Sequence, residues 1–184
     1  LLRNVADVYE KKLEDKEQAY ETLKVAWSFD YTDRTTSGEL ERIARVTQKW
    51  NDLLGTANEA LREVEDNETK IAICLDCAKW YGQELSRPEY AIPYYQQILS
   101  LDPGNIYTLA NLGAAQMELN KLPEAETHLK RALVLDADDA FSLSLLGLLK
   151  FRQQKADEAF DALSRAAKLD PDNAQTQNYL GLVL

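Results

Sequence analysis

The second half of the sequence repeats with a period of 34 residues. An upstream ending, Ala26 to Tyr31, resembles the repeated segment endings but lies two periods plus four residues before the first of them. A fixed period of this length indicates stacked copies of one small unit rather than a single globular core. Three columns of residues keep the 34-residue step: the aspartates Asp102, Asp136 and Asp170, the glycines Gly113, Gly147 and Gly181, and the alanines Ala91, Ala125 and Ala159.

Each period contains two helical patterns. Apolar and small residues recur at i, i+3, i+4 and i+7, which is the spacing of one helix face. The first face consists of Leu109, Leu112, Gly113 and Gln116, and the second of Ala125, Leu129, Ala132 and Leu133. Small residues at Gly113 and Ala125 predict a close approach of two antiparallel helices, because a large side chain would force them apart.

Short polar segments separate these helical patterns. Pro123 suits the first turn of a helix, where its missing N–H removes no hydrogen bond. Asn105 and Asp139 are predicted N-caps, and Asn173 or Asp172 has the same role one period later. One helix pair cannot cover its own apolar faces, so the pairs are expected to stack.

The composition excludes several other classes of protein. Only 7 Gly and 5 Pro argue against a β-rich chain with many tight turns. A dispersed formal net charge of −10 argues against nucleic-acid binding, which needs a basic face. Two cysteines cannot support a disulfide scaffold, and no apolar run approaches the ~20 residues that span a bilayer. The start at Leu1, with neither an initiator Met nor a signal peptide, suggests a piece of a longer protein.

The repeated residues resemble the tetratricopeptide repeat family, whose pattern is Trp-x2-Leu-Gly-x2-Tyr, then Ala-x3-Phe, then Ala and Pro. The resemblance covers essentially the whole chain and is strongest from about residue 70 onward. The family's tryptophan position departs from the pattern and holds Cys74, Leu109, Leu143 or Gln177. The matching residues are Ala6, Tyr9, Ala19, Leu23 and Ala26 early in the chain, Leu112, Gly113, Ala125, Leu129 and Ala132 in the fourth unit, Leu146, Gly147, Ala159, Leu163, Ala166 and Pro171 in the fifth, and Leu180 and Gly181 in the last.

This resemblance implies an all-α fold, a right-handed superhelical α-solenoid of stacked antiparallel helix pairs. We expect one repeat domain over 1–184, with about five units and a final unpaired helix. The second unit is expected to be a helix pair rather than a regular repeat. The expected units are 1–34, 35–66, 67–104, 105–138 and 139–172, with a partial unit at 173–184.

Two local irregularities lead to specific expectations. The small positions of the two helices are 12 residues apart in the fourth and fifth units but 13 apart in the first and third. The turn between the helices should therefore be one residue longer in the first and third units. Pro93 falls inside a helix opened by Pro88, so that helix should start late, near Tyr90, or be kinked.

The residues that often carry catalysis or metal binding have simpler explanations here. Cys74 and Cys77 form a Cys-x-x-Cys pair within a predicted helix, with no strand before it and no further ligand cluster, so we interpret them as buried structural thiols. His128 is the only histidine and is expected at a helix rim. A calcium loop opening at Asp170 is rejected, because its sixth and twelfth positions hold Gln175 and Gly181 rather than Gly and Glu. We predict no catalytic residue, no metal site and no cofactor.

The family resemblance also implies a binding surface. The first helix of each pair lines the concave side of such a stack. The implied positions give a cation-rich N-terminal half and an aromatic and aliphatic C-terminal half, so an acidic segment of a ligand would meet the cations. The resemblance further implies that the Asn111 amide could clamp a ligand backbone. The candidate partner-binding residues are Arg42, Arg45, Lys49, Lys79, Tyr107, Asn111, Phe141, Leu145, Leu148 and Tyr179.

These features predict a non-enzymatic scaffold that binds a protein partner, as a peptide or helical segment, in a concave groove. Two alternatives stay open. The repeats could be a regulatory or sensor domain of a larger enzyme or transcription factor. They could also be a self-association module, with homo-oligomers formed through an exposed C-terminal helix. No nucleic acid and no membrane insertion are expected.

Overall fold

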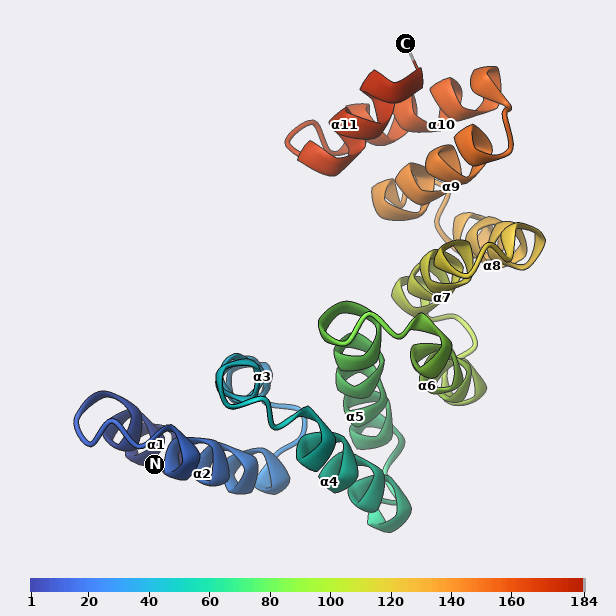
Figure 1. The fold of residues 1–184 in the computed structure, drawn as a ribbon. Coiled ribbons are helices and arrows are strands. Elements are labelled where there is room, and N and C mark those ends of the chain that lie inside the picture. Colours follow the sequence, from blue (N-terminus) through green and yellow to red (C-terminus); the bar gives the residue numbers. More distant parts are fainter. Residues whose placement is uncertain (184) are drawn as a thin grey trace. The chain divides into compact units, whose positions relative to one another are not determined.

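The computed structural model describes residues 1–183, and within them every regular element is a helix (Figure 1). The all-α prediction is confirmed. The predicted final segment 173–184 is described as far as Val183. The elements are α1 (Leu2–Lys11), α2 (Lys16–Phe29), α3 (Arg34–Thr47), α4 (Trp50–Glu63), α5 (Asn67–Lys79), the π-helical segment η1 (Trp80–Glu84), α6 (Pro88–Leu101), α7 (Ile106–Glu118), α8 (Leu122–Leu135), α9 (Ala140–Arg152), α10 (Ala156–Leu169) and α11 (Ala174–Val183).

The helix starts follow the side chains that the sequence offers as caps. Asn105 accepts the backbone N–H of Thr108 at 2.9 Å, and Asp139 accepts that of Ser142 at 2.8 Å. One period later the cap is Asn173 rather than Asp172. Each cap satisfies a backbone donor that the first helical turn leaves without a partner. The predicted caps are confirmed.

A left-handed residue marks each turn within a helix pair. None of these residues is glycine, and successive ones along the chain are 34 or 38 positions apart. The conformation at such a position reverses the chain after a helix and is costly for a residue with a Cβ. The five residues are Glu14, Gln48, Ser86, Asn120 and Gln154, with φ values between 52° and 62°.

The extra residue of the first and third units is accommodated in two different ways. In the first unit the turn between α1 and α2 is longer, as predicted, and runs from Lys12 to Asp15. In the third unit the prediction is wrong. The extra residue lies inside the helix, where the Leu85 N–H bonds to the Trp80 carbonyl in the i→i−5 pattern of a π-helix.

Pro93 does not delay its helix. α6 begins at Pro88 and includes Pro93, so the predicted late start near Tyr90 is wrong. Pro88 lies in the first turn, where proline is favourable, and the Tyr90 N–H already bonds to the Arg87 carbonyl.

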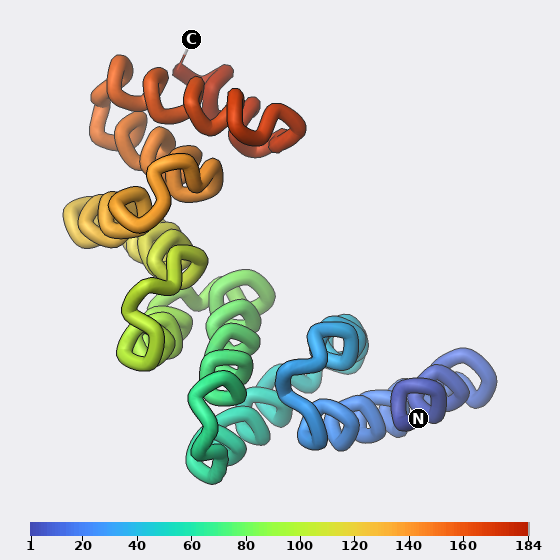
Figure 2. Tube along the Cα trace, turned by 180° about the vertical axis from the view of Figure 1, so that it is seen from behind, coloured from blue at the N-terminus to red at the C-terminus, as the bar shows by residue number. Residues whose placement is uncertain are grey.

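The chain divides into two compact units, unit 1 (Leu1–Leu85) and unit 2 (Ser86–Leu184). The boundary falls between the two helices of the predicted third repeat, just after η1. Within unit 1, α2 packs on α1 and α3, and α4 packs on α5. Within unit 2, each helix from α6 to α11 packs on the next one along the chain, as the green to red part of Figure 2 from residue 88 onward shows.

The core of unit 1 contains all three tryptophans of the sequence. The ring centroids of Trp27 and Trp80 are 5.6 Å apart, and those of Trp50 and Trp80 are 6.4 Å apart. The Tyr31 ring meets Trp27 edge-on at 4.7 Å. Aromatic rings at these separations bury large apolar areas and join α2, α4 and η1 into one core.

The core of unit 2 depends on close helix approach at glycine. A Cβ placed on Gly113 would come within 2.8 Å of the Leu129 side chain, and one on Gly147 within 2.5 Å of the Leu163 side chain. Leu129 and Leu163 are fully buried. The predicted contact between the small positions of paired helices is therefore confirmed, and α8 and α10 pack tightly on α7 and α9.

A cluster of charges joins the helices of unit 2 at one edge of this core. The Lys150 ammonium group lies 2.8 Å from Glu126 and 2.9 Å from Glu158, and only 6% of the Lys150 side chain is exposed. The Gln153 amide also donates to Glu126, at 2.9 Å. Hydrogen bonds from Lys130, Lys150 and Gln153 lower the pKa of Glu126 to about 2. The cluster links α8, α9 and α10.

We predict that Gly147→Ala destabilises the protein although alanine is the better helix former. The added methyl group would overlap Leu163, and overpacking costs about 1–3 kcal/mol against a propensity gain of about 0.5–1 kcal/mol. The free energy of unfolding, measured by urea titration with far-UV circular dichroism, should fall by about 1–2 kcal/mol. Gly55→Ala is the matched control, because a Cβ at Gly55 meets nothing within 4 Å. A gain in stability for both variants would contradict the close contact.

We predict that Glu126→Gln lowers stability at pH 7 and removes part of the acid sensitivity. The folded pKa of Glu126 is depressed, so its contribution is present above the ordinary pKa of 4.5 and is lost as the pH falls toward about 2. Because Lys130 is exposed and its interaction is screened by solvent, the free energy of unfolding should fall by only about 1–2 kcal/mol at pH 7. Urea titrations at pH 7 and pH 3 should show the two proteins converging in acid. A constant difference at both pH values would contradict the role of the ionised carboxylate.

Candidate partner-binding surface

The first helices of unit 2 lie next to one another. α9 packs against both α7 and α11. The 34-residue period places equivalent residues in three rows along these helices, each row advancing by one helix per period. The rows are Tyr107, Phe141 and Gln175, then Asn111, Leu145 and Tyr179, then Ala114, Leu148 and Leu182. We call these three rows the first-helix surface.

The first-helix surface exposes large aromatic and aliphatic side chains. Tyr107 is 57% exposed, Phe141 37% and Leu182 59%. Leu148 and Tyr179 are partly buried. Exposed aromatic rings beside partly buried aliphatic groups are typical of the centre of a protein interface.

Leu145 differs from the other predicted residues of this surface because it is buried. It packs in an apolar cluster with Ala110, Met117 and Leu149, and Leu148 packs at the edge of the same cluster. The side chain at this position faces the preceding first helix, so Leu145 contributes to the contact between α7 and α9. The surface available to a partner is formed by its neighbours.

The Asn111 amide is partly committed to its own helix. Its side-chain N–H₂ group donates to the Tyr107 carbonyl at 2.7 Å. The amide has two donor hydrogens and a carbonyl acceptor, and this bond uses one of the donors.

The four predicted cations lie in unit 1, and each is paired with a carboxylate. Arg45 makes two hydrogen bonds to Glu84, at 2.8 and 2.6 Å. This bidentate pairing lowers the pKa of Glu84. The other pairs are Arg42 with Glu10, Lys49 with Glu17 at 2.7 Å, and Lys79 with Glu41 at 2.7 Å.

These carboxylates were not recognised from the sequence. Glu10 and Glu17 lie 32 positions before Arg42 and Lys49, and Glu84 lies 39 positions after Arg45. The sequence feature that could have identified these partners is an acidic residue about one repeat period before or after each cation. The predicted cation-rich surface is a set of ion pairs between helices of unit 1.

Asp76, on the same helix as Lys79, is a buried acceptor for three donors. Its carboxylate lies 2.7 Å from Arg34, 2.8 Å from the Ser37 hydroxyl and 3.3 Å from the Trp27 indole nitrogen. Burial raises the pKa of Asp76, and the Arg34 charge and the two neutral donors act in the opposite direction. The group links α2, α3 and α5.

The cysteines and the histidine have the structural positions that the sequence indicates. Cys74 and Cys77 are fully buried free thiols. Burial raises the pKa of Cys74 to about 11 and that of Cys77 well above its ordinary value, so both are protonated and unreactive at neutral pH. His128 is partly buried, with Nδ1 2.8 Å from Gln116 Oε1 and 2.9 Å from the Glu124 carbonyl.

Within residues 1–183 no three His, Cys, Asp or Glu side chains gather as metal ligands would. Among the same residues, no helix has both the length and the apolar character needed to cross a membrane.

Paired helices, close contacts at glycine and a row of exposed residues on the first helices define a helical repeat protein. Residues 84–149 match the family model described as "Tetratricopeptide repeat". The family resemblance seen in the sequence is confirmed. No curated protein shows significant similarity to this chain.

Solved structures with the same fold include proteins that bind peptides. The "First TPR of Spaghetti (RPAP3) bound to HSP90 peptide SRMEEVD" is 25% identical, with a TM-score of 0.59, covering 64% of this chain and 92% of that one. "YrrB: a TPR protein with an unusual peptide-binding site" is 17% identical, with a TM-score of 0.61, covering 96% of this chain and 89% of that one. These similarities confirm the predicted solenoid class.

A third similar structure is part of an enzyme. The Thermobaculum terrenum O-GlcNAc transferase mutant K341M is 22% identical, with a TM-score of 0.62, covering 66% of this chain but only 23% of that one. The fold of this chain thus also occurs as a segment of a larger enzyme. The fold and the family support a protein-interaction scaffold.

We predict that Asp76→Ala destabilises unit 1 by about 2–4 kcal/mol, because the Trp27 and Ser37 donors lose a buried acceptor. Asp76→Asn keeps an acceptor and should lose less. All three tryptophans lie in unit 1, so urea titration followed by tryptophan fluorescence reports on this unit. Equal stability of the alanine variant and the unsubstituted protein would contradict the role of Asp76.

Proposed function

We propose that this chain is a non-enzymatic scaffold that binds a peptide or helical segment of a partner protein on the first-helix surface of unit 2. The observation that carries the proposal is the exposure of Tyr107 and Phe141 at equivalent positions one period apart. Large rings held on rigid helices provide contact area at low cost in conformational entropy. The peptide complex of one structurally similar repeat protein and the peptide-binding site of another support the same role.

The proposed contacts have different tasks. Tyr107, Phe141, Leu148 and Tyr179 would supply apolar contact, and Leu145 would support them from below. Asn111 would hydrogen-bond a ligand backbone with its remaining N–H and its amide oxygen. Binding of this kind depends on apolar area and should change little with salt.

The four cations of unit 1 would contact a ligand only if a ligand carboxylate replaced the intramolecular carboxylate that each is paired with. An acidic ligand segment at Arg42, Arg45, Lys49 or Lys79 would compete with a carboxylate already in place. Such an exchange replaces one ion pair by another and yields little net free energy. The apolar rows of unit 2 are therefore the main proposed source of affinity.

The test compares two equally exposed aromatic residues on different helix rows. Phe141 on α9 is 37% exposed, and Phe160 on the second helix α10 is 41% exposed. A partner recovered by affinity purification should bind the double variant Tyr107→Ala/Phe141→Ala at least about tenfold more weakly, as expected for loss of two aromatic contacts. Phe160→Ala should retain full affinity.

The outcomes separate the competing functions. Unchanged affinity of the double variant, or an equal loss with Phe160→Ala, would remove the first-helix surface as the binding site. Recovery of untagged chain by tagged chain as the sole partner would instead identify the self-association module. A regulatory domain would show binding to a catalytic or DNA-binding segment of its own full-length protein.

A further inference from the structure

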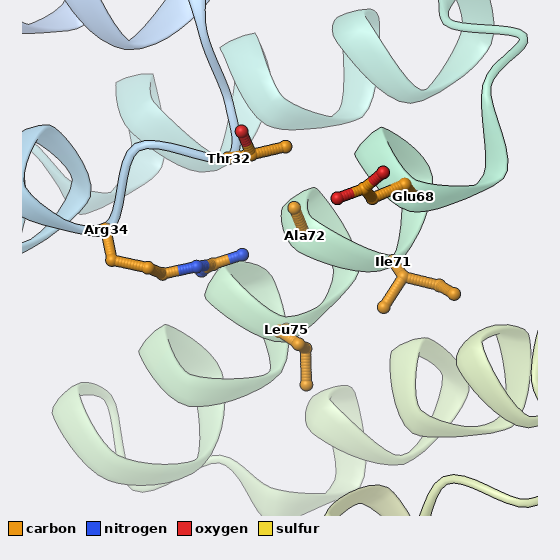
Figure 3. A pocket seen from close by; sticks show the side chains of 6 residues that line it. All are labelled: Thr32, Arg34, Glu68, Ile71, Ala72 and Leu75. Atoms are coloured by element: carbon orange, nitrogen blue, oxygen red, sulfur yellow. The ribbon is translucent and has the colours of Figure 1, made fainter.

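Unit 1 contains an open pocket of about 210 Å³ that no repeat motif accounts for (Figure 3). It lies between the segment that leads into α3 and the first turns of α5. Its lining residues are Thr32, Arg34, Glu68, Ile71, Ala72 and Leu75. We call it the α5 pocket.

The α5 pocket combines an apolar side with a polar side. Ala72 is buried, and Ile71 and Leu75 are partly buried one helical turn apart on α5. Figure 3 shows Arg34 and Glu68 directed toward each other from opposite sides, with Ala72 between them. A ligand would therefore meet aliphatic carbon, a guanidinium group and a carboxylate within one small site.

The two charges of the α5 pocket are not equivalent. Arg34 lies 2.7 Å from the Asp76 carboxylate, whose side chain is only 7% exposed, so much of the Arg34 charge is offset. The guanidinium group has five N–H donors, and donors that do not reach Asp76 can still bond a neutral oxygen. Glu68 is exposed and has no ion-pair partner in the described part of the chain.

The surroundings of Glu68 add negative charge. Glu63, Glu65, Asp66 and Glu68 fall within six consecutive residues at the junction of α4 and α5. Arg62 and Lys70 flank them, so the four carboxylates and two cations of residues 62–70 give a formal net charge of −2. The Asp66 carboxylate caps α5 by accepting the Thr69 N–H at 2.7 Å, which keeps the start of the helix in place. A positively charged ligand segment would be attracted to this edge of the pocket, and the effect would weaken with salt.

We propose that the α5 pocket binds an extended segment of a partner protein in which an aliphatic residue is flanked by lysine or arginine. The aliphatic side chain contacts Ile71, Ala72 and Leu75. A backbone carbonyl of the segment accepts a hydrogen bond from Arg34, and the flanking cation pairs with Glu68. The pocket volume suits one side chain, because sites for whole small molecules are typically about 300–1,000 Å³.

This proposal does not rest on the first-helix surface. Every lining residue belongs to unit 1, whereas α7, α9 and α11 belong to unit 2. The charge preference is also different, because the ligand proposed here is basic. One site can therefore be absent while the other is present.

The experiment uses capped pentapeptides and the methyl groups of the pocket itself. Thr32, Ile71, Ala72 and Leu75 all carry methyl groups, so a methyl NMR titration observes the site directly. The peptide Gly-Lys-Leu-Lys-Gly should shift these signals in a saturable way, with a dissociation constant of about 1 mM or tighter. The peptides Gly-Lys-Ser-Lys-Gly and Gly-Glu-Leu-Glu-Gly should bind at least about tenfold more weakly, a difference of about 1.4 kcal/mol.

Two variants of the protein test the charged and the apolar contacts of the α5 pocket separately. Glu68→Gln should weaken binding and reduce its dependence on salt, and Leu75→Ala should weaken it without changing that dependence. Glu59→Gln is the matched control, since it removes an exposed carboxylate from α4 outside the pocket. Circular dichroism establishes that each variant is folded.

Three results would overturn the proposal. The first is the absence of saturable shifts at the pocket methyl groups up to the solubility limit of the lysine peptide. The second is equal binding of the leucine and serine peptides, which would reduce the interaction to non-specific charge attraction. The third is the same loss of affinity in Glu59→Gln as in Glu68→Gln.

Discussion

The close contact between paired helices at Gly113 and Gly147 is the constraint on which unit 2 depends. The chain can bring α8 onto α7, and α10 onto α9, only where no Cβ intervenes between glycine and the buried leucine opposite. The close approach at glycine fixes the distance between the two helices of a pair and so gives each pair the same geometry. The following pair then stacks on it after the same number of residues. The 34-residue period, the caps and the left-handed turn residues all follow from this repetition.

Features that repeat with this period could be predicted from the sequence, and features that do not repeat could not. Asn105 and Asp139 were predicted as caps because each opens an equivalent helix. The extra residue of the third unit was predicted in its turn, but it lies in the π-helical segment η1. The spacing shows that a residue is inserted but not where it lies. In the structure the π-helical segment begins at Trp80, whose ring packs with Trp27 and Trp50.

The candidate sites show the same limit. Tyr107 and Phe141 were identified because the family resemblance implies that their position on a first helix lines the concave side. The cations were predicted to line a binding groove, and their intramolecular partners were missed, since Glu84 reaches Arg45 from a segment 39 positions away. The α5 pocket was not predicted at all. It depends on Thr32 and Arg34, in the polar stretch that interrupts the period, and such a stretch has no counterpart elsewhere in the chain.

The pairing of the cations changes the electrostatic character of unit 1. A bidentate pair such as Arg45 with Glu84 is already oriented and partly desolvated, so an incoming carboxylate gains only the difference between two similar interactions. An exposed carboxylate without such a partner gains the full free energy of a new ion pair when a cation binds. Arg42, Arg45, Lys49 and Lys79 are engaged in this way, whereas Glu68 is an exposed carboxylate with no ion-pair partner among residues 1–183. In the two proposals, unit 1 distinguishes a basic segment by charge and unit 2 binds mainly through apolar area. A scaffold with both sites would select two partners by different physical criteria.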